Sequence, residues 1–171
     1  MSAVPAGDEV HPDAPAPQLR VAGPADLDAI MALETSTFGT DAWSVGMMRQ
    51  DLELSHCHYL VAEPPDGGPL LGYAGLLSPR GAADADIQTI AVAPDARRNG
   101  LGRTLMTTLI AEATLRGAKR LFLEVRADNP GAQHLYETLD FLPIGVRRGY
   151  YQPDNVHAIV MRLDLPAGAS S

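Results

Sequence analysis

A basic, glycine-containing turn between a strand and a helix is the feature that most constrains this chain. Residues 88–94 form a β-type apolar run that ends at a proline, and leucines at positions 101, 105 and 109 repeat with helical spacing. The segment between them reads Arg97-Arg98-Asn99-Gly100-Leu101-Gly102. Because the first N–H groups of a helix lack partners within the helix and carry partial positive charge, this order of elements predicts a phosphate-binding turn.

The side chains of the turn favour a pyrophosphate as the ligand. Gly100 and Gly102 let the backbone approach a ligand closely, and Arg97, Arg98 and Arg103 can add charge-assisted hydrogen bonds. No Gly-Lys-Ser/Thr sequence follows, which excludes a Walker loop, and the dinucleotide fingerprint lacks its third glycine. From the turn alone a second interpretation stays open, in which it is a plain connection with solvated arginines.

Charge and composition exclude several classes of protein. The 171-residue chain has 13 basic and 21 acidic residues, whereas a general nucleic-acid binder needs a surplus of Lys and Arg. The net charge of −8 favours cationic partners such as basic peptides. No apolar run of about 18 residues is present, and the N-terminal stretch is too acidic and too rich in proline for a signal peptide. We therefore expect a cytoplasmic protein without membrane contact.

The single cysteine excludes an internal disulfide and a cysteine-rich zinc site. It lies in the triplet His56-Cys57-His58, which offers three potential ligands. Neighbouring positions on a strand face opposite sides, however, and no second group of ligands follows. We expect no metal site.

Proline content divides the chain into one folded domain and two tails. Residues 1–17 are rich in Pro and Ala and cannot form a core, so we expect a disordered tail. Residues 18–165 have the length of a single domain with a substantial core. Residues 166–171 are expected to form a flexible C-terminal tail.

The remaining pattern predicts an α/β (α+β) fold in the order β-α-α-β-β-β-α-β-α-β-β. The expected strands are 19–21, 58–63, 70–77, 86–92, 121–125, 144–150 and 156–164, and the expected helices are 24–34, 44–54, 100–116 and 130–139. Ser44 and Asn129 are expected N-caps, and Gly117 an expected helix stop. The order indicates a mixed sheet of about seven strands with about four helices packed against it. The almost continuously apolar run 121–125 predicts a strand covered on both faces.

The strand and turn together resemble the central motif of the GNAT superfamily of N-acetyltransferases. The residues that carry the resemblance are Ile90-Ala91-Val92-Ala93-Pro94 and then Arg97-Arg98-Asn99-Gly100-Leu101-Gly102. The resemblance extends over residues 19–165 and implies acetyl-CoA as the acetyl donor, with its pyrophosphate on the amides of 97–102 and its pantetheine arm along 90–92. The implied cofactor-binding residues are Ile90, Ala91, Val92, Arg97, Arg98, Asn99, Gly100, Leu101, Gly102, Arg103 and Asn129.

A narrower resemblance involves the second half of the chain. Leu-Glu-Val-Arg at 123–126 with Asn129, Leu-Tyr-Glu at 135–137, and Arg-Arg-Gly-Tyr-Tyr at 147–151 are similar to the RimI branch of the superfamily. RimI enzymes are bacterial acetyltransferases that act on the N-terminal alanine of a ribosomal protein. The implied partner is a protein N-terminus with a basic start, and the implied catalytic residues are Glu124 as general base and Tyr136 as general acid.

These two residues also have structural interpretations. A carboxylate such as that of Glu124 is costly inside an apolar strand unless it has solvent access, a partner such as Arg126, or a catalytic role. Tyr136 lies on the apolar face of its helix, where a core tyrosine with a satisfied hydroxyl is common. Helix capping alone would explain Asn129.

Four aromatic residues are candidates for the substrate groove: Phe38, Trp43, Tyr150 and Tyr151. The Phe-to-Trp-Ser segment resembles the stretch of RimI at which the second helix begins beside the peptide pocket. His157 is a departure, because the relatives carry an acidic residue at this place, just before an alanine. This departure leaves strict selectivity for alanine open.

Two alternative functions stay open at this point. Within the same fold, the acceptor could be a lysine side chain or a small amine. In a different class, the chain could be a non-catalytic acyl-CoA-binding module, although the presence of both Glu124 and Tyr136 argues against this.

Overall fold

Seven strands form one mixed sheet in the computed structural model, which describes residues 16–97 and 99–166. The strands lie side by side in the order β1-β2-β3-β4-β5-β7-β6. β4 and β5 are parallel, and all other neighbours in the sheet are antiparallel. Their bounds are Gln18–Val21 (β1), Cys57–Glu63 (β2), Gly72–Leu77 (β3), Asp84–Val92 (β4), Arg120–Arg126 (β5), Leu142–Tyr151 (β6) and Val156–Asp164 (β7).

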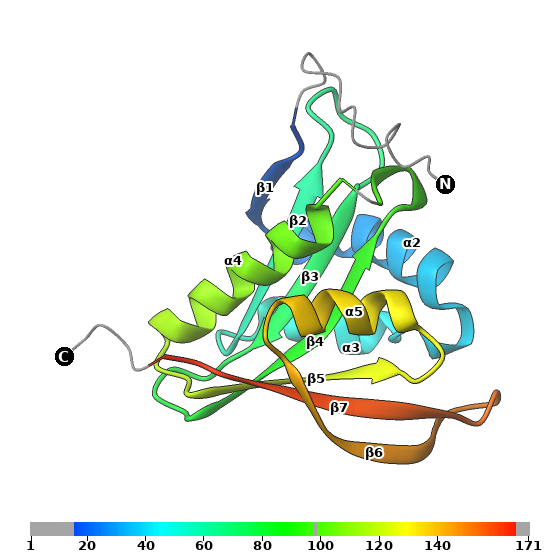
Figure 1. The fold of residues 1–171 in the computed structure, drawn as a ribbon. Coiled ribbons are helices and arrows are strands. Elements are labelled where there is room, and N and C mark those ends of the chain that lie inside the picture. The colour runs from blue at the N-terminus through cyan, green and yellow to red at the C-terminus, as the bar shows by residue number, and fades with distance from the viewer. Residues whose placement is uncertain (1–15, 98, 167–171) are drawn as a thin grey trace.

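Helices cover both faces of this sheet in the described part of the chain (Figure 1). They are Leu27–Phe38 (α2), Val45–Glu53 (α3), Leu101–Leu115 (α4) and Pro130–Thr138 (α5), with short 3-10 turns at Pro24–Asp26 (η1), Gly39–Asp41 (η2) and Pro94–Ala96 (η3). The core beneath α2 and α3 buries Ile30 and Met48, and the core beneath α4 and α5 buries Leu105 and Phe141. The mixed sheet and the order of elements confirm the predicted fold class.

Capping residues set most helix boundaries as the sequence predicts. Ser44 and Asn129 each accept a backbone N–H hydrogen bond at 3.1 Å in the first turn of α3 and α5. Gly117 follows α4 with a φ of 96°. The predicted end of α2 is wrong, because the helix continues to Phe38 in spite of the weak helix propensity of the preceding Thr and Ser residues. It ends at Gly39, whose φ of 55° is a conformation that glycine adopts readily.

The parallel strands β4 and β5 separate after three paired positions. Their ladder runs from Asp84 opposite Arg120 to Asp86 opposite Phe122, whereas β4 continues to Val92 in contact with β3. Beyond Asp86, the edge of β4 that faces β5 therefore has no strand partner among the described residues. Figure 1 shows the two strands diverging from their common end. The backbone groups of this free edge are available to a ligand.

The expectation that the strand at 121–125 is covered on both faces is wrong. Leu121, Leu123 and Val125 are buried, but Phe122 and Glu124 on the opposite face of β5 are only partly buried. The reason is the separation of β4 from β5, which leaves a cavity beside this face. An apolar run predicts the strand but cannot reveal that a neighbouring strand departs.

The predicted tails lie almost wholly outside the described residues. The ordered strands begin at Gln18 and end at Asp164, and the backbone N–H of Leu165 still donates to the carbonyl of Lys119 at 2.8 Å. In the described ranges, no helix has the length and apolar character needed to cross a membrane.

Candidate active site

Two adjoining cavities occupy the space where β4 and β5 diverge. The larger, called the groove below, has a volume of about 870 Å³ and follows β4 from the turn before α4 to α5. The smaller, called the pocket, has a volume of about 670 Å³ and lies toward β6 and η2. Trp43, Glu124 and Tyr151 line both cavities, so the two meet at these side chains.

The turn before α4 borders the groove as the sequence predicts. Gly100 is the N-cap of α4 and has a left-handed φ of 80°. The Arg97 Nε donates to the carbonyl of Val92 at 3.0 Å, which joins the turn to the end of β4. A Cβ at Gly102 would lie 3.4 Å from the side chain of Leu135, which is an ordinary van der Waals contact. Both Gly100 and Gly102 line the groove.

Most of the predicted cofactor-binding residues line the groove: Ile90, Ala91, Val92, Arg97, Gly100, Gly102, Arg103 and Asn129. Asn99 is exposed and is not among the lining residues, and the side chain of Leu101 is buried in the core. Only backbone groups of Leu101 are therefore available to a ligand. Arg98 lies outside the described residues.

Glu124 lies where the groove and the pocket meet. Its side chain is 28% exposed, and its Oε2 is 2.6 Å from the Nε of Arg147 on β6. This ion pair and solvent access compensate a carboxylate that would otherwise be costly in an apolar strand. Arg126, the partner that the sequence suggested, binds other carboxylates instead.

Tyr136 of α5 lines the groove with a side chain that is almost fully buried. Its ring meets the ring of Phe141 edge to face, with the centroids 6.1 Å apart. Burial, with a smaller contribution from Tyr151, raises the pKa of the Tyr136 phenol to about 12, so the hydroxyl is protonated at neutral pH. No hydrogen-bond partner for this hydroxyl occurs among the described residues, which leaves it available as a donor.

The predicted substrate-binding aromatics are brought together at the two cavities. Trp43, Tyr150 and Tyr151 line the pocket, where the two tyrosine rings meet edge to face with centroids 5.1 Å apart. Phe38 lines the groove rather than the pocket. The backbone N–H of Trp43 donates to the buried carboxylate of Glu34 at 2.9 Å, which fixes the segment between η2 and α3.

The region that contains the turn, Glu124 and Tyr136 matches a known family. Residues 27–141 match the acetyltransferase (GNAT) family. The chain is a GNAT acetyltransferase. The match confirms the resemblance that the sequence motifs indicated.

Proteins similar to this GNAT enzyme are named as N-acetyltransferases. A putative [ribosomal protein bS18]-alanine N-acetyltransferase of Bacillus subtilis is 36% identical over 80% of this chain and 87% of its own length. The N-alpha-acetyltransferase RimI of Mycobacterium tuberculosis is also 36% identical, over 82% of this chain and 87% of its own length. The crystal structure of the ribosomal-protein-S18-alanine N-acetyltransferase from Escherichia coli has a TM-score of 0.78 and 31% identity, covering 91% of this chain and 98% of that one.

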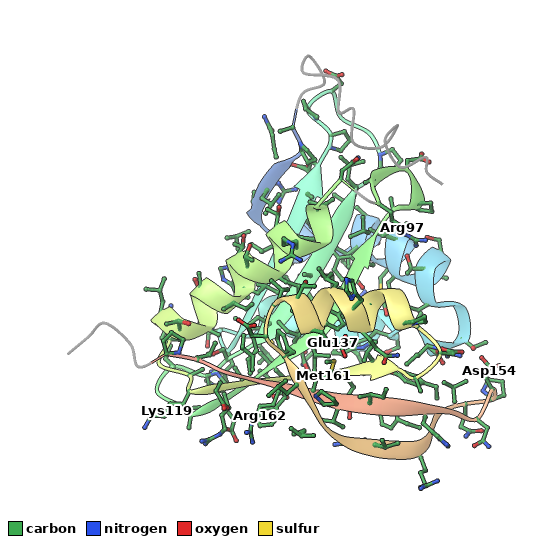
Figure 2. All side chains as sticks on the ribbon, in the orientation of Figure 1. Arg97, Lys119, Glu137, Asp154, Met161 and Arg162 are labelled. Atoms are coloured by element: carbon green, nitrogen blue, oxygen red, sulfur yellow. The ribbon has the colours of Figure 1, made fainter. Side chains whose placement is uncertain are left out.

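Arg126, which lines the groove of the acetyltransferase, joins three segments of the chain. Its guanidinium contacts Asp41 in η2 at 2.5 Å, Asp128 after β5 at 3.0 Å, and Asp154 at 3.3 Å. Figure 2 shows Asp154 at the tip of the hairpin formed by β6 and β7. The guanidinium also lies over the ring of Tyr151, 5.2 Å from its centroid. The loop, the strand and the hairpin are thereby tied together.

Three charged residues that line the pocket were not predicted as site residues from the sequence: Asp41, Asp86 and Arg147. Arg147 lies within a motif quoted for the family, but only the pairing of β6 with β7 brings it to Glu124. No sequence signal identifies Asp86, because its access to the pocket depends on where β4 leaves β5. Burial, followed by the nearby carboxylates of Asp84 and Glu124, raises the pKa of Asp86.

His157 is not among the residues that line either cavity of the GNAT enzyme. Its Nδ1 accepts a hydrogen bond from the backbone N–H of Gly149 at 2.8 Å, across the hairpin of β6 and β7. Its role in this structure is therefore to hold the hairpin.

In the described ranges, no group of three or more potential metal ligands is present. His58, one of the three residues of the His-Cys-His triplet, has its Nδ1 3.9 Å from the carboxylate of Glu112.

Proposed function

We propose that this GNAT enzyme transfers an acetyl group from acetyl-CoA to the α-amine of a ribosomal protein that begins with alanine. The position of Glu124 carries the proposal, since this carboxylate lies where the groove, which reaches the N-terminus of α4, meets the open acidic pocket. The names of two relatives at 36% identity support the choice of acceptor. A ribosomal protein as acceptor implies that the reaction takes place in the cytoplasm.

The groove fits acetyl-CoA as the donor. The free N–H groups at the start of α4 would bind the pyrophosphate, with Arg97 and Arg103 at its edge. The free edge of β4 at Ile90 to Val92 would pair with the amides of the pantetheine arm in the manner of an added strand. The side-chain oxygen of Asn129, the N-cap of α5, already accepts a hydrogen bond from the backbone N–H of Ala132, and its side-chain NH2 group can donate to acetyl-CoA.

A bulge in β4 offers a site for the thioester carbonyl. Thr89 pairs with Gly75 and Ile87 pairs with Leu76, so Gln88 is the extra residue. Bulges change the direction of backbone groups, and this one lies at the level of Glu124, where both cavities are lined by Gln88. A backbone N–H aimed at the carbonyl oxygen would stabilise the charge that develops in the tetrahedral intermediate.

Glu124 would act as the general base on the acceptor. An N-terminal ammonium has a pKa near ~8, so little free energy is needed to remove its proton at neutral pH. The freed amine attacks the thioester carbon, the C–N bond forms, and the C–S bond breaks as the tetrahedral intermediate collapses. The nitrogen loses its second proton in this collapse, and that proton balances the one taken up by the thiolate, so the products are the amide and the CoA thiol. Glu124 passes the proton to solvent, and Arg147 compensates the carboxylate between turnovers.

Tyr136 would assist the departure of the CoA thiolate. Because burial raises the pKa of its phenol to about 12, the hydroxyl is protonated throughout the neutral range and can donate to the sulfur as negative charge develops there. No cysteine takes part: burial, with the charge of Asp51, raises the pKa of the Cys57 thiol to about 11, and Cys57 lines neither cavity. These features support direct transfer without an acetyl-enzyme.

Intact mass spectrometry on three matched peptides tests this proposal. One peptide begins with a free alanine and contains no lysine, one has a blocked N-terminus and one internal lysine, and one begins with a free bulky residue. We expect a single acetyl group, of about 42 Da, on the first peptide and much slower reaction of the other two. Equal reaction of the blocked lysine peptide would overturn the choice of the α-amine, and equal reaction of the third would overturn the preference for alanine.

A further inference from the structure

The geometry points to Asp86 as the residue that selects acceptors with a cationic side chain within their first three residues. This inference rests on the proposed function, because it concerns the peptide that places its α-amine beside Glu124. It adds a specificity for the side chains that follow the N-terminus, for which no residue has been assigned so far.

Asp86 and Glu124 face the same pocket from neighbouring strands. Asp86 pairs with Phe122, which lies two residues before Glu124 on the same face of β5. From ordinary strand spacings, the Cα atoms of Asp86 and Glu124 are roughly 8 Å apart. This distance is about two residues of an extended peptide, so a peptide with its amine at Glu124 has its next side chains within reach of Asp86.

Asp86 is the carboxylate of the pocket without a counter-ion. Asp41 is paired with Arg126, and Glu124 is paired with Arg147. For Asp86, no ion pair and no side-chain hydrogen bond occurs among the described residues, although the side chain is half-buried. A partly buried carboxylate without a partner is unfavourable, and a cation supplied by the acceptor would compensate it.

The electrostatics of the pocket favour the same ligand. Burial first, and then the carboxylates of Asp84 and Glu124, raise the pKa of Asp86, which means that its own negative charge is unfavourable here without a cation nearby. Arg147 is the one basic side chain among the described lining residues, and Glu124 already binds it. A lysine or arginine side chain of the acceptor could therefore pair with Asp86, because no basic side chain of the pocket is paired with Asp86 already.

The aromatic residues that line the pocket can pack against the methylene groups of a lysine or arginine side chain. Trp43, Phe122 and the rings of Tyr150 and Tyr151 line the pocket around Asp86. Lys and Arg cover apolar surface with their methylene groups while the charged end reaches a polar partner. The pocket thus combines aromatic walls with one unpaired acid, a combination that a small or acidic side chain cannot use.

Steady-state kinetics on a pair of isosteric peptides test the inference. Both peptides begin with alanine and differ only in carrying arginine or neutral citrulline at position 2, and a second pair has the change at position 3. For the wild-type enzyme we expect kcat/KM to be about tenfold higher for arginine than for citrulline in at least one pair, a ratio between those of exposed and buried ion pairs. In Asp86→Asn this ratio should fall to about one, mainly through a higher KM for the arginine peptide, and in Asp86→Glu it should largely recover.

The matched control is Asp66→Asn, which removes the same charge from an exposed loop and should leave the ratio unchanged. The inference is overturned if the wild-type enzyme does not distinguish arginine from citrulline at either position, a result that needs no variant. It is also overturned if Asp86→Asn binds acetyl-CoA normally and keeps the wild-type ratio. Failure of the proposed function is a different result, in which neither peptide of a pair is acetylated on its α-amine.

Discussion

The guanidinium of Arg126 on β5 contacts the carboxylate of Asp41 in η2, with 2.5 Å between Nη1 and Oδ2. The two residues are far apart in the sequence, yet both line the groove, and Asp41 also lines the pocket. Arg126 follows Glu124 by two residues on the same strand face, so the contact ties the loop that carries Trp43 to the strand that carries the proposed base. The shape of the acceptor site therefore depends on an ion pair that takes no part in the acetyl transfer itself.

Replacing Arg126 by glutamine should impair acceptor binding more than chemistry. The loop at Asp41 and the hairpin at Asp154 would lose their common partner, and we expect the KM for the peptide to rise about tenfold. The KM for acetyl-CoA should change less, although Arg126 lines the groove, because Arg126 lies away from the turn before α4. Steady-state kinetics with each substrate varied in turn measure both constants. Arg120→Gln, which removes an exposed ion pair from the same strand, is the control. A loss confined to kcat would contradict this role for Arg126.

Glu124→Gln should reduce turnover with little effect on the donor. Loss of a general base typically costs about 10² to 10⁴ in rate, while Gln keeps the shape of the groove proposed for acetyl-CoA. Release of the CoA thiol gives kcat, and calorimetry gives the affinity for acetyl-CoA. Glu137→Gln makes the same chemical change on the exposed side of α5 and should be neutral. If Glu124→Gln retained full turnover, Glu124 would not be the base.

Tyr136→Phe should lower kcat by about 10- to 100-fold, because the hydrogen bond to the leaving sulfur is lost while the ring is retained. The edge-to-face contact with Phe141 does not involve the hydroxyl, so the thermal midpoint should change little. Thiol release and thermal unfolding measured on the same preparation separate the two effects. A large fall in the thermal midpoint with normal kcat would make Tyr136 a structural residue only.

Gly100→Ala should weaken acetyl-CoA binding beyond its effect on stability. A Cβ at Gly100 meets no atom within 4 Å, so the cost is the backbone strain of a φ of 80°. Gly81 has a φ of 85° and equally open space, but it lies outside both cavities. Both alanine variants should lose about 1–2 kcal/mol in the free energy of unfolding. Only Gly100→Ala should raise the dissociation constant for acetyl-CoA, and equal affinities would argue against the turn as the pyrophosphate site.

The buried carboxyl of Glu34 should make stability depend on pH. Burial raises its pKa above the ordinary value of 4.5, in spite of hydrogen bonds from the Trp43 N–H and the Thr89 hydroxyl. The unfolded chain therefore ionises at a lower pH than the folded one. The contribution of Glu34 to the free energy of unfolding is fully present below about pH 4.5. It is lost as the pH rises from there through the raised pKa that Glu34 has in the folded protein.

Glu34→Gln removes this titration while keeping groups that can bond to Trp43 and Thr89. Relative to the variant, the wild-type free energy of unfolding should fall as pH rises above about 4.5 and then become constant. Urea unfolding of both proteins between pH 4 and pH 8 measures the difference. Glu53→Gln on the exposed surface of α3 is the control. A difference that does not change with pH would contradict the raised pKa of Glu34.

The local elements of this fold were predictable because their signals lie within a few residues. Ser44, Asn129 and Gly117 act on the backbone next to them, so they marked the helix boundaries correctly. The turn at Gly100 was found for the same reason, since a glycine-containing start of a helix after a strand has its physical meaning in one short segment. Only α2 ended later than expected, where packing outweighed weak helix propensity.

The sequence by itself determined the order of elements, the glycine-containing turn before α4 and the identity of Glu124 and Tyr136 as candidates. The tertiary structure alone decided what surrounds them. The pairing of Glu124 with Arg147, the tie from Arg126 to Asp41 and the exposure of Asp86 to the pocket all depend on contacts across the sheet. Those contacts follow from the position at which β4 separates from β5 and from the pairing of β6 with β7. The pairing of two strands that are distant in the sequence cannot be predicted from the residues of either strand alone.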